Sequence, residues 1–330
     1  MTLHEDKTLF RQAVQFTADQ LKIAAIYVEK DYWVTYALYT IFNNDIGRDT
    51  IFKGGTALSK CYKIIDRFSE DIDLVVLRRA GESDNKLKSK IGIISKVVGY
   101  VLAEVEIKGL THKLGMNRKT AHSYNKEFNG KYGQVRDVIV LESSWLGHHE
   151  PFTQKMLNSF IGEMMLNNGQ KEIAEGHGLL PFEVNVLEPV RTLCEKTMSL
   201  VRFSYGENPL DNLKKKIRHT YDLHKLLSQK KFSDFFHSPA FEQMLLKVAN
   251  DDVLSFKNNN SWLVHHPKDA LLFKDLELIW PELAIVYNGD FRNLVYGDFP
   301  NGKAVFDTLK IIKERLANVN WEIIIVPKSN

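Results

Sequence analysis

Cysteine is scarce in this chain of 330 residues, which contains only Cys61 and Cys194. Each lies in a segment of helical periodicity, far from the other in the sequence. This distribution argues against a disulfide framework and against a zinc site built on thiolates. We expect both to be small buried side chains.

Long hydrophobic runs are also missing. No stretch of eighteen consecutive apolar residues occurs, and the first ten residues lack the apolar core of a signal peptide. No internal repeat or low-complexity tract is present either. We therefore expect a cytoplasmic protein without membrane contact.

The net charge is small as well. A formal charge of +3 is too low to establish nucleic-acid binding. What is present is the composition of a soluble globular protein, with 44% hydrophobic and 26% charged residues. A chain of this length can bury a substantial core in one or two domains.

The most informative stretch runs from Ile51 to Val76. In it, Gly54 and Gly55 follow a short apolar run, and paired glycines let the backbone turn sharply and approach a ligand closely. Thr56 is expected to cap a helix whose free N-terminal amides face an anion such as a phosphate. An ordinary turn is the alternative for a Gly-Gly pair.

Two carboxylates follow on a strand-like run. Asp71 and Asp73 lie two residues apart, so both point to one face. Mg²⁺ prefers oxygen ligands and takes one or two protein carboxylates together with waters and substrate phosphates. The order Gly-Gly, helix, Asp-x-Asp therefore predicts nucleotide and Mg²⁺ binding, whereas Asp-x-Asp alone also occurs at ordinary strand edges.

This pattern resembles the nucleotidyltransferase (DNA polymerase β-like) superfamily, although the spacer of residues 56 to 70 is slightly longer than usual. The fuller string GGTALS…RFSEDIDL is similar to the AbiEii/AbiGii-type (MenT-like) toxin family. The resemblance implies transfer of a nucleoside monophosphate from an NTP, with GTP and CTP as candidates, and Mg²⁺ held by Asp71 and Asp73. It assigns nucleotide binding in this stretch to Lys53, Gly54, Gly55, Thr56, Ser59, Arg67 and Ser69.

A third carboxylate is expected on a neighbouring strand. Residues 134 to 143 have the β-branched composition of a strand, and Glu142 closes it. By resemblance, Glu142 helps to bind the metal or to activate the acceptor hydroxyl. Asp137 is the alternative.

Two later motifs are similar to the same family. Lys196 borders the buried stripe of a helix that begins near Pro189, and the resemblance assigns it to the triphosphate; on chemistry alone it would bury only its stem. Arg218 and Asp222 are one turn apart on a helix expected from Asp211 to about Ser228. Chemistry alone makes them a surface ion pair, whereas the resemblance places Arg218 at the nucleotide and Asp222 among the catalytic residues.

The stretch from Thr111 to Tyr132 carries five basic residues, one acidic residue and three aromatics. Basic residues interleaved with aromatics can bind a phosphate backbone and stack on bases, so this stretch is a candidate RNA-binding or nucleotide-binding surface. A basic β-hairpin that turns near Asn129-Gly130 is an equally good interpretation. Lys30 and Asp31 are interpreted as a charge pair at a helix start. The lysines at 86, 88 and 90 are interpreted as a solvated helix face.

Together these features predict an α+β protein. Residues 1–155 would form a polymerase-β-like nucleotidyltransferase domain with a small mixed sheet, and residues 156–330 a mainly helical domain completing the cleft. The resemblance further implies a toxin of a toxin–antitoxin or phage-defence system, with a separately encoded antitoxin and tRNA or another RNA as acceptor. Nucleotidylation of a protein or small molecule, or a non-catalytic nucleotide-binding module, are the alternatives.

Overall fold

The computed structural model of the protein describes residues 1–113, 115–130, 135–146 and 150–325. The chain forms two compact units. The first comprises Met1–Trp145 and Phe152–Leu187, and the second comprises Leu146–Pro151 and Glu188–Asn330. The expected division after residue 155 falls inside a strand of the first unit. Because that strand is hydrogen-bonded into the sheet, the main part of the second unit begins only at Glu188.

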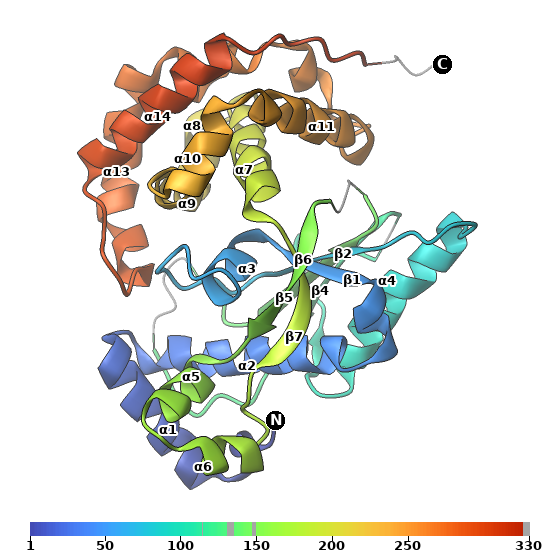
Figure 1. The fold of residues 1–330 in the computed structure, drawn as a ribbon, viewed down its shortest axis with the longest axis vertical. Coiled ribbons are helices and arrows are strands. Elements are labelled where there is room, and N and C mark those ends of the chain that lie inside the picture. Colours follow the sequence, from blue (N-terminus) through green and yellow to red (C-terminus); the bar gives the residue numbers. More distant parts are fainter. Residues whose placement is uncertain (114, 131–134, 147–149, 326–330) are drawn as a thin grey trace. The chain divides into compact units, whose positions relative to one another are not determined.

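A seven-stranded mixed sheet forms the centre of the first unit, in the order β3-β4-β5-β2-β1-β7-β6 (Figure 1). Its strands are β1 (Thr50–Lys53), β2 (Ile72–Val76), β3 (Glu104–Val105), β4 (Asn117–His122), β5 (Ile139–Ser144), β6 (Phe152–Leu157) and β7 (Phe182–Leu187). β2 is antiparallel to β1 and parallel to β5. The expected α+β class is confirmed. The strand predicted to begin at residue 134 is present as β5, which begins later, at Ile139. Residue 134 itself lies outside the described residues.

Helices cover this sheet. They are α1 (Lys7–Leu21), α2 (Ala25–Phe42), α3 (Gly54–Lys60), α4 (Asp84–Gly99), α5 (Phe160–Asn167) and α6 (Lys171–Gly176). Apolar residues at helical spacing predict two helices between Thr8 and Phe42, and α1 and α2 confirm them. The same spacing predicts one helix from Ser83 to Val105, but α4 ends at Gly99, and residues 104 and 105 form β3.

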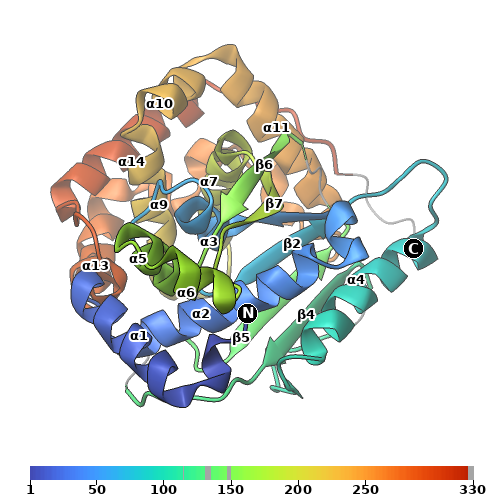
Figure 2. The same ribbon diagram turned by 60° about the horizontal axis from the view of Figure 1, so that its bottom comes forward.

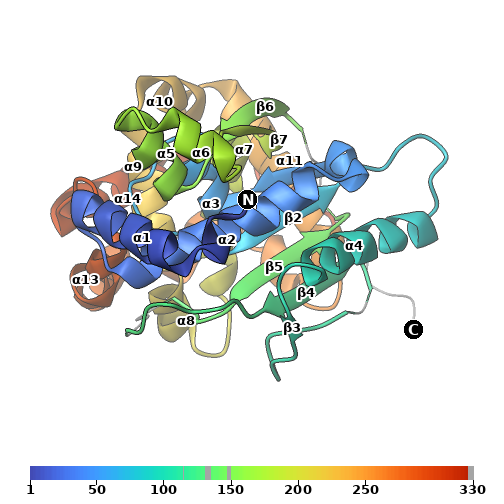
Figure 3. The same ribbon diagram turned by 90° about the horizontal axis from the view of Figure 1, so that it is seen from below.

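One face of the sheet carries the main hydrophobic core. α2 and α4 contact each other and lie along the same side of the central strands (Figures 2 and 3). Ile72, Leu74 and Val76 of β2 belong to the core packed there. Since successive residues of a strand point to opposite faces, Asp73 points away from this core, to the other face of the sheet.

The glycine pair begins α3 itself. Lys53 is the N-cap residue, and no side chain caps the helix. The expectation that Thr56 is the cap was wrong, because Thr56 lies inside the helix and is buried. Ala57, Leu58, Tyr62 and Ile65 recur at helical spacing and predict a helix that reaches Ile65, but α3 ends at Lys60.

The regular structure of the second unit, in the described part of the chain, is helical. Its α-helices are α7 (Pro189–Phe203), α8 (Pro209–Lys215), α9 (Ile217–Leu227), α10 (Lys230–His237), α11 (Pro239–Ser255), α12 (Leu271–Lys274), α13 (Leu276–Asn288) and α14 (Gly302–Ala317). α7 packs against α9 and α11, and α14 packs against α9 (Figure 1).

The second unit differs from the sequence interpretation in one place. The single helix expected from Asp211 to Ser228 is divided into α8 and α9 at Lys216, and Asp211 lies in the first turn of α8 rather than at a cap. α7 begins as predicted, with Pro189 in its first turn. None of the helices in the described ranges combines the length and hydrophobicity of a membrane span.

Candidate active site

Four charged side chains form a row across the sheet face opposite α2 and α4. Strand pairing places Lys53 beside Asp73, Asp73 beside Glu142, and Glu142 beside Lys119. The four residues come from the adjacent strands β1, β2, β5 and β4, and adjacent strands lie about 4.8 Å apart. This charged row therefore consists of two neighbouring carboxylates flanked by two ammonium groups.

The pKa values of Asp73 and Glu142 are shifted in opposite directions. Burial, the charge of Glu142 and the charge of Asp71 raise the pKa of Asp73 to about 7. Burial also acts to raise the pKa of Glu142, but Lys119 Nζ at 2.8 Å and Asn117 Nδ2 at 3.1 Å from its carboxylate oxygens hold it below its usual value. At neutral pH, Glu142 is therefore ionised while Asp73 is near the midpoint of its titration.

The two glycines make room for side chains of the site. Gly54 has a φ of +81°, and a Cβ there would overlap Asp73 Oδ2. A Cβ on Gly55 would lie 2.7 Å from Arg67 Nη2 and 3.1 Å from Ser69 Oγ. Glycine is required at position 54 because of its positive φ and the close approach of the Asp73 carboxylate, whereas a Cβ at position 55 would displace the end of the Arg67 side chain.

The neighbouring polar residues hold the segment that leads to Asp71. Thr56 Oγ1 donates to the carbonyl oxygen of Asp71 at 2.6 Å and lies 3.0 Å from Ser69 Oγ. Arg67 is buried, and its Nη1 donates to the carbonyl oxygen of Phe68 at 3.1 Å. Ser59 is buried in α3. These side chains have structural contacts, and their assignment to the nucleotide stays a prediction.

Asp71 precedes β2, and its Oδ1 lies 3.3 Å from Arg136 Nη1. The alternative third carboxylate, Asp137, lies ahead of β5 with 63% of its side chain exposed and pairs with Lys126 at 2.9 Å. Glu142, in contrast, lies directly beside Asp73. The geometry thus brings Glu142, and not Asp137, into the charged row.

The carboxylates suit a magnesium ion by their chemistry. Within the described ranges no group of three or more His, Cys, Asp or Glu side chains is arranged to hold a metal, so Asp71, Asp73 and Glu142 do not form one ready-made cage. Mg²⁺ commonly takes one or two carboxylates. The adjacent Asp73 and Glu142 meet that requirement. Burial and, after it, the charges of Glu142 and Asp71 raise the pKa of Asp73, and a cation bound there would oppose the repulsion among these carboxylates.

In the second unit, Lys196 and Asp222 form a buried ion pair with Nζ 2.6 Å from Oδ2. Asp222 has no exposed surface, so the interpretation of a surface ion pair with Arg218 was wrong. α7 and α9 pack against each other and bring the two residues together. Both family motifs thus meet within one unit, while Arg218 lies partly exposed on α9.

The interpretation of Lys30 and Asp31 as a charge pair at a helix start was wrong, because both are buried inside α2. Lys30 and Asp31 lie within α2, where their side chains reach partners on other segments. Lys30 donates to Glu70, and Asp31 pairs with Lys60 at 2.5 Å. This part of α2 therefore holds two points within the stretch from Ile51 to Val76, the end of α3 and the residue before Asp71.

The basic stretch from residue 111 is largely neutralised. Lys113 pairs with Glu104, Lys119 with Glu142 and Lys126 with Asp137. Tyr124 is buried against Trp33, while Lys131 and Tyr132 lie outside the described residues. The strand pairing of the hairpin alternative is confirmed, because β4 and β5 are antiparallel partners with His122 opposite Ile139. The connection between them spans residues 123–138 and is centred near Asn129-Gly130, and part of it lies outside the described residues.

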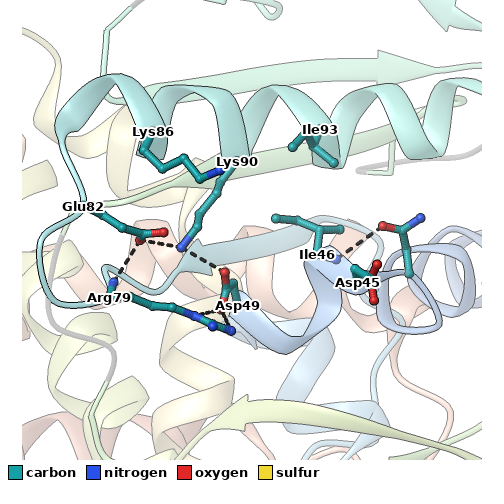
Figure 4. Close-up of a pocket in the computed structure, with 9 residues that line it drawn as sticks. Asp45, Ile46, Asp49, Arg79, Glu82, Lys86, Lys90 and Ile93 are labelled. Carbon is teal, nitrogen blue, oxygen red and sulfur yellow. Dashed lines mark hydrogen bonds and ion pairs between the residues drawn. The ribbon is translucent and has the colours of Figure 1, made fainter.

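An open pocket of about 370 Å³ lies at the N-terminal half of α4 (Figure 4). Lys90, expected to be solvated, is buried there and pairs with Asp49 at 2.9 Å and Glu82 at 2.5 Å. Arg79 also pairs with Asp49. These charges satisfy one another, so the network joins α4 to the preceding loop.

Sequence reasoning missed two side chains that donate hydrogen bonds to Glu142. Asn117 and Lys119 alternate on β4 and both donate to Glu142. Their spacing of two was a usable signal, but Lys119 was considered only as part of a basic surface. Arg136 was missed because its role depends on contacts distant in sequence.

Comparison with known families gives a match over most of the chain. The family model described as "Nucleotidyl transferase AbiEii toxin, Type IV TA system" matches residues 36–308. A search of curated proteins finds no significant match. The matched range contains the charged row and the Lys196–Asp222 pair.

Proposed function

The chain belongs to the AbiEii family of nucleotidyl transferase toxins of type IV toxin–antitoxin systems, and from this premise we propose that it transfers a nucleoside monophosphate from an NTP to RNA. An acceptor hydroxyl oxygen forms a bond to the α-phosphorus while the bond to the β-phosphate oxygen breaks. Pyrophosphate leaves with the electron pair, and the hydroxyl proton passes to a base.

The observation that supports this reaction most directly is the charged row. Asp73 and Glu142, with Asp71 at the edge, would hold Mg²⁺, which neutralises triphosphate charge when bound. Glu142 is ionised at neutral pH, so it can alternatively accept the proton of the acceptor hydroxyl. Lys53 and Lys119 place positive charge on either side of the carboxylates, where it offsets their mutual repulsion.

The remaining roles rest on the family pattern. Gly54 and Gly55, with Thr56 or Ser59, contact the triphosphate through the turn into α3. Lys196 and Arg218 bind phosphate, and Asp222 fixes the Lys196 ammonium. Phosphoryl transfer depends mainly on such positioning and electrostatics.

The acceptor we propose is tRNA or another RNA, in keeping with a toxin held in check by a separately encoded antitoxin and with a role in phage defence. The neutralised basic stretch gives this proposal little support, so it rests on the family. The experiment must therefore leave the acceptor open.

The test incubates purified protein with each α-labelled NTP, Mg²⁺ and total bacterial RNA. An Asp71→Ala/Asp73→Ala variant serves as the inactive control and Asp137→Asn as the matched surface control. Label in RNA with the wild type and Asp137→Asn, but not with the double variant, supports the proposal. Pyrophosphate release without labelled RNA, with the nucleoside monophosphate passed to water or to the protein itself, excludes RNA as the acceptor and favours a protein or small molecule. NTP binding without turnover favours a binding module.

A further inference from the structure

The backbone of Arg136 is held at both of its polar groups by one buried ion pair. Its N–H donates to Glu70 Oε1 at 3.0 Å, and its carbonyl oxygen accepts from the Lys30 ammonium, which also donates to Glu70. The side chains of Lys30 and Glu70 have no exposed surface. Both backbone polar groups of this residue, which lies outside any helix or strand, are therefore bound by buried side chains.

This arrangement is costly to build. Burial raises the pKa of Glu70 and lowers the pKa of Lys30, so burial acts against both charges. A buried ion pair contributes little net stability compared with apolar side chains of similar volume. The pair is better explained by what it positions than by a contribution to folding.

What it positions is the Arg136 guanidinium. Nη1 lies 3.3 Å from Asp71 Oδ1, and 43% of the side chain is exposed. Asp71 directly follows Glu70, and Arg136 lies shortly before β5, which carries Glu142. The clamp formed by Lys30 and Glu70 thus fixes the guanidinium at the edge of the candidate active site.

We propose that Arg136 contacts the triphosphate of the NTP and that Lys30 and Glu70 are positioning residues for it. The proposal rests on the proposed function. A guanidinium presents five N–H donors in a planar fork, so it can hold Asp71 with one edge and a phosphate with another. The ammonium of Lys119, in contrast, is directed to Glu142.

The test measures equilibrium binding of an NTP analogue with a non-cleavable α,β bond, in Mg²⁺, by calorimetry, for each of the four bases. Arg136→Ala should weaken binding about 10- to 100-fold, and Arg136→Lys should restore part of the loss. Arg78→Ala is the matched control, because Arg78 is an exposed arginine paired with Asp84. Its affinity should equal that of the wild type.

The clamp is tested with Lys30→Met/Glu70→Met, which removes both buried charges together so that neither is left unpaired. This variant also loses the two hydrogen bonds to the Arg136 backbone, so it should stay folded with a slightly lowered melting temperature yet lose as much affinity as Arg136→Ala. Adding Arg136→Ala to it should cause no further loss. Wild-type affinity in Arg136→Ala overturns the proposal and leaves the transferase intact. A wild type that binds none of the four analogues contradicts the proposed function and this assignment with it.

Discussion

Asp73 Oδ2 occupies the space that a Cβ on Gly54 would fill. The glycine pair and the Asp-x-Asp motif are therefore two parts of one site, in contact through the turn between β1 and α3. The absence of a side chain at Gly54 is what allows the Asp73 carboxylate to approach the backbone so closely.

Replacing Gly54 by alanine should abolish most activity. The φ of +81° disfavours a side chain, and the new Cβ would displace Asp73 from the charged row. We expect a destabilisation of about 1–3 kcal/mol and at least about a 100-fold loss of turnover. Gly92→Ala on α4 is the control, since a Cβ there meets nothing within 4 Å, and it should leave activity unchanged.

The raised pKa of Asp73 predicts a pH-dependent stability. Between the ordinary value of 3.8 and about 7 the folded protein keeps a proton that the unfolded chain has lost, so the free energy of unfolding falls as pH rises. The amide of an Asp73→Asn variant cannot titrate. The stability of this variant relative to wild type should therefore increase by about 2–3 kcal/mol between pH 5 and pH 8 in metal-free urea unfolding.

Asp137→Asn controls for this effect. Lys126 lowers the pKa of Asp137, so that carboxyl is ionised throughout this range and its variant should show a constant offset. If the stability difference between Asp73→Asn and wild type were equally constant over this pH range, the raised pKa of Asp73 in the charged row would be refuted.

Lys119→Met should shift the pH dependence of turnover. Burial acts to raise the pKa of Glu142 and the pKa of Asp73, and the Lys119 ammonium opposes both effects, so its removal raises both pKa values. The acidic limb of the pH–rate profile should therefore move to higher pH, whichever of the two carboxylates sets it. Lys126→Met, which removes the partner of Asp137, should not move it.

Variants of the Lys196–Asp222 pair can distinguish a role in stability from a role in catalysis. Lys196→Met leaves a buried carboxylate without this ammonium and should destabilise the protein by about 3–5 kcal/mol in urea unfolding. Lys196→Met/Asp222→Leu should recover most of that stability. If Lys196 binds phosphate, the double variant stays inactive; recovered turnover would restrict the pair to a structural role.

Local patterns were enough to predict part of this molecule. The alternation of Asp73 with apolar residues indicated a strand, which β2 confirms, and Pro189 marked the start of α7 correctly. Glu142 followed an apolar run and proved to lie beside Asp73, because β5 pairs in parallel with β2 in that register.

The rest depended on contacts between distant segments. Lys30, Asp31 and Lys90 resemble solvated charges in the sequence, yet each is buried against a partner elsewhere in the first unit. Asp222 was interpreted with its helical neighbour Arg218, whereas the packing of α7 on α9 gave it Lys196. Spacing along the chain cannot reveal which distant charge compensates a buried one.

The most direct test of the account is single-turnover pyrophosphate release by Glu142→Gln beside Asp137→Asn, at saturating NTP and Mg²⁺. We predict a loss of at least about 100-fold for Glu142→Gln and a rate within about twofold of wild type for Asp137→Asn. A wild-type rate in Glu142→Gln would contradict the claim that Asp73 and Glu142 act together as the catalytic centre.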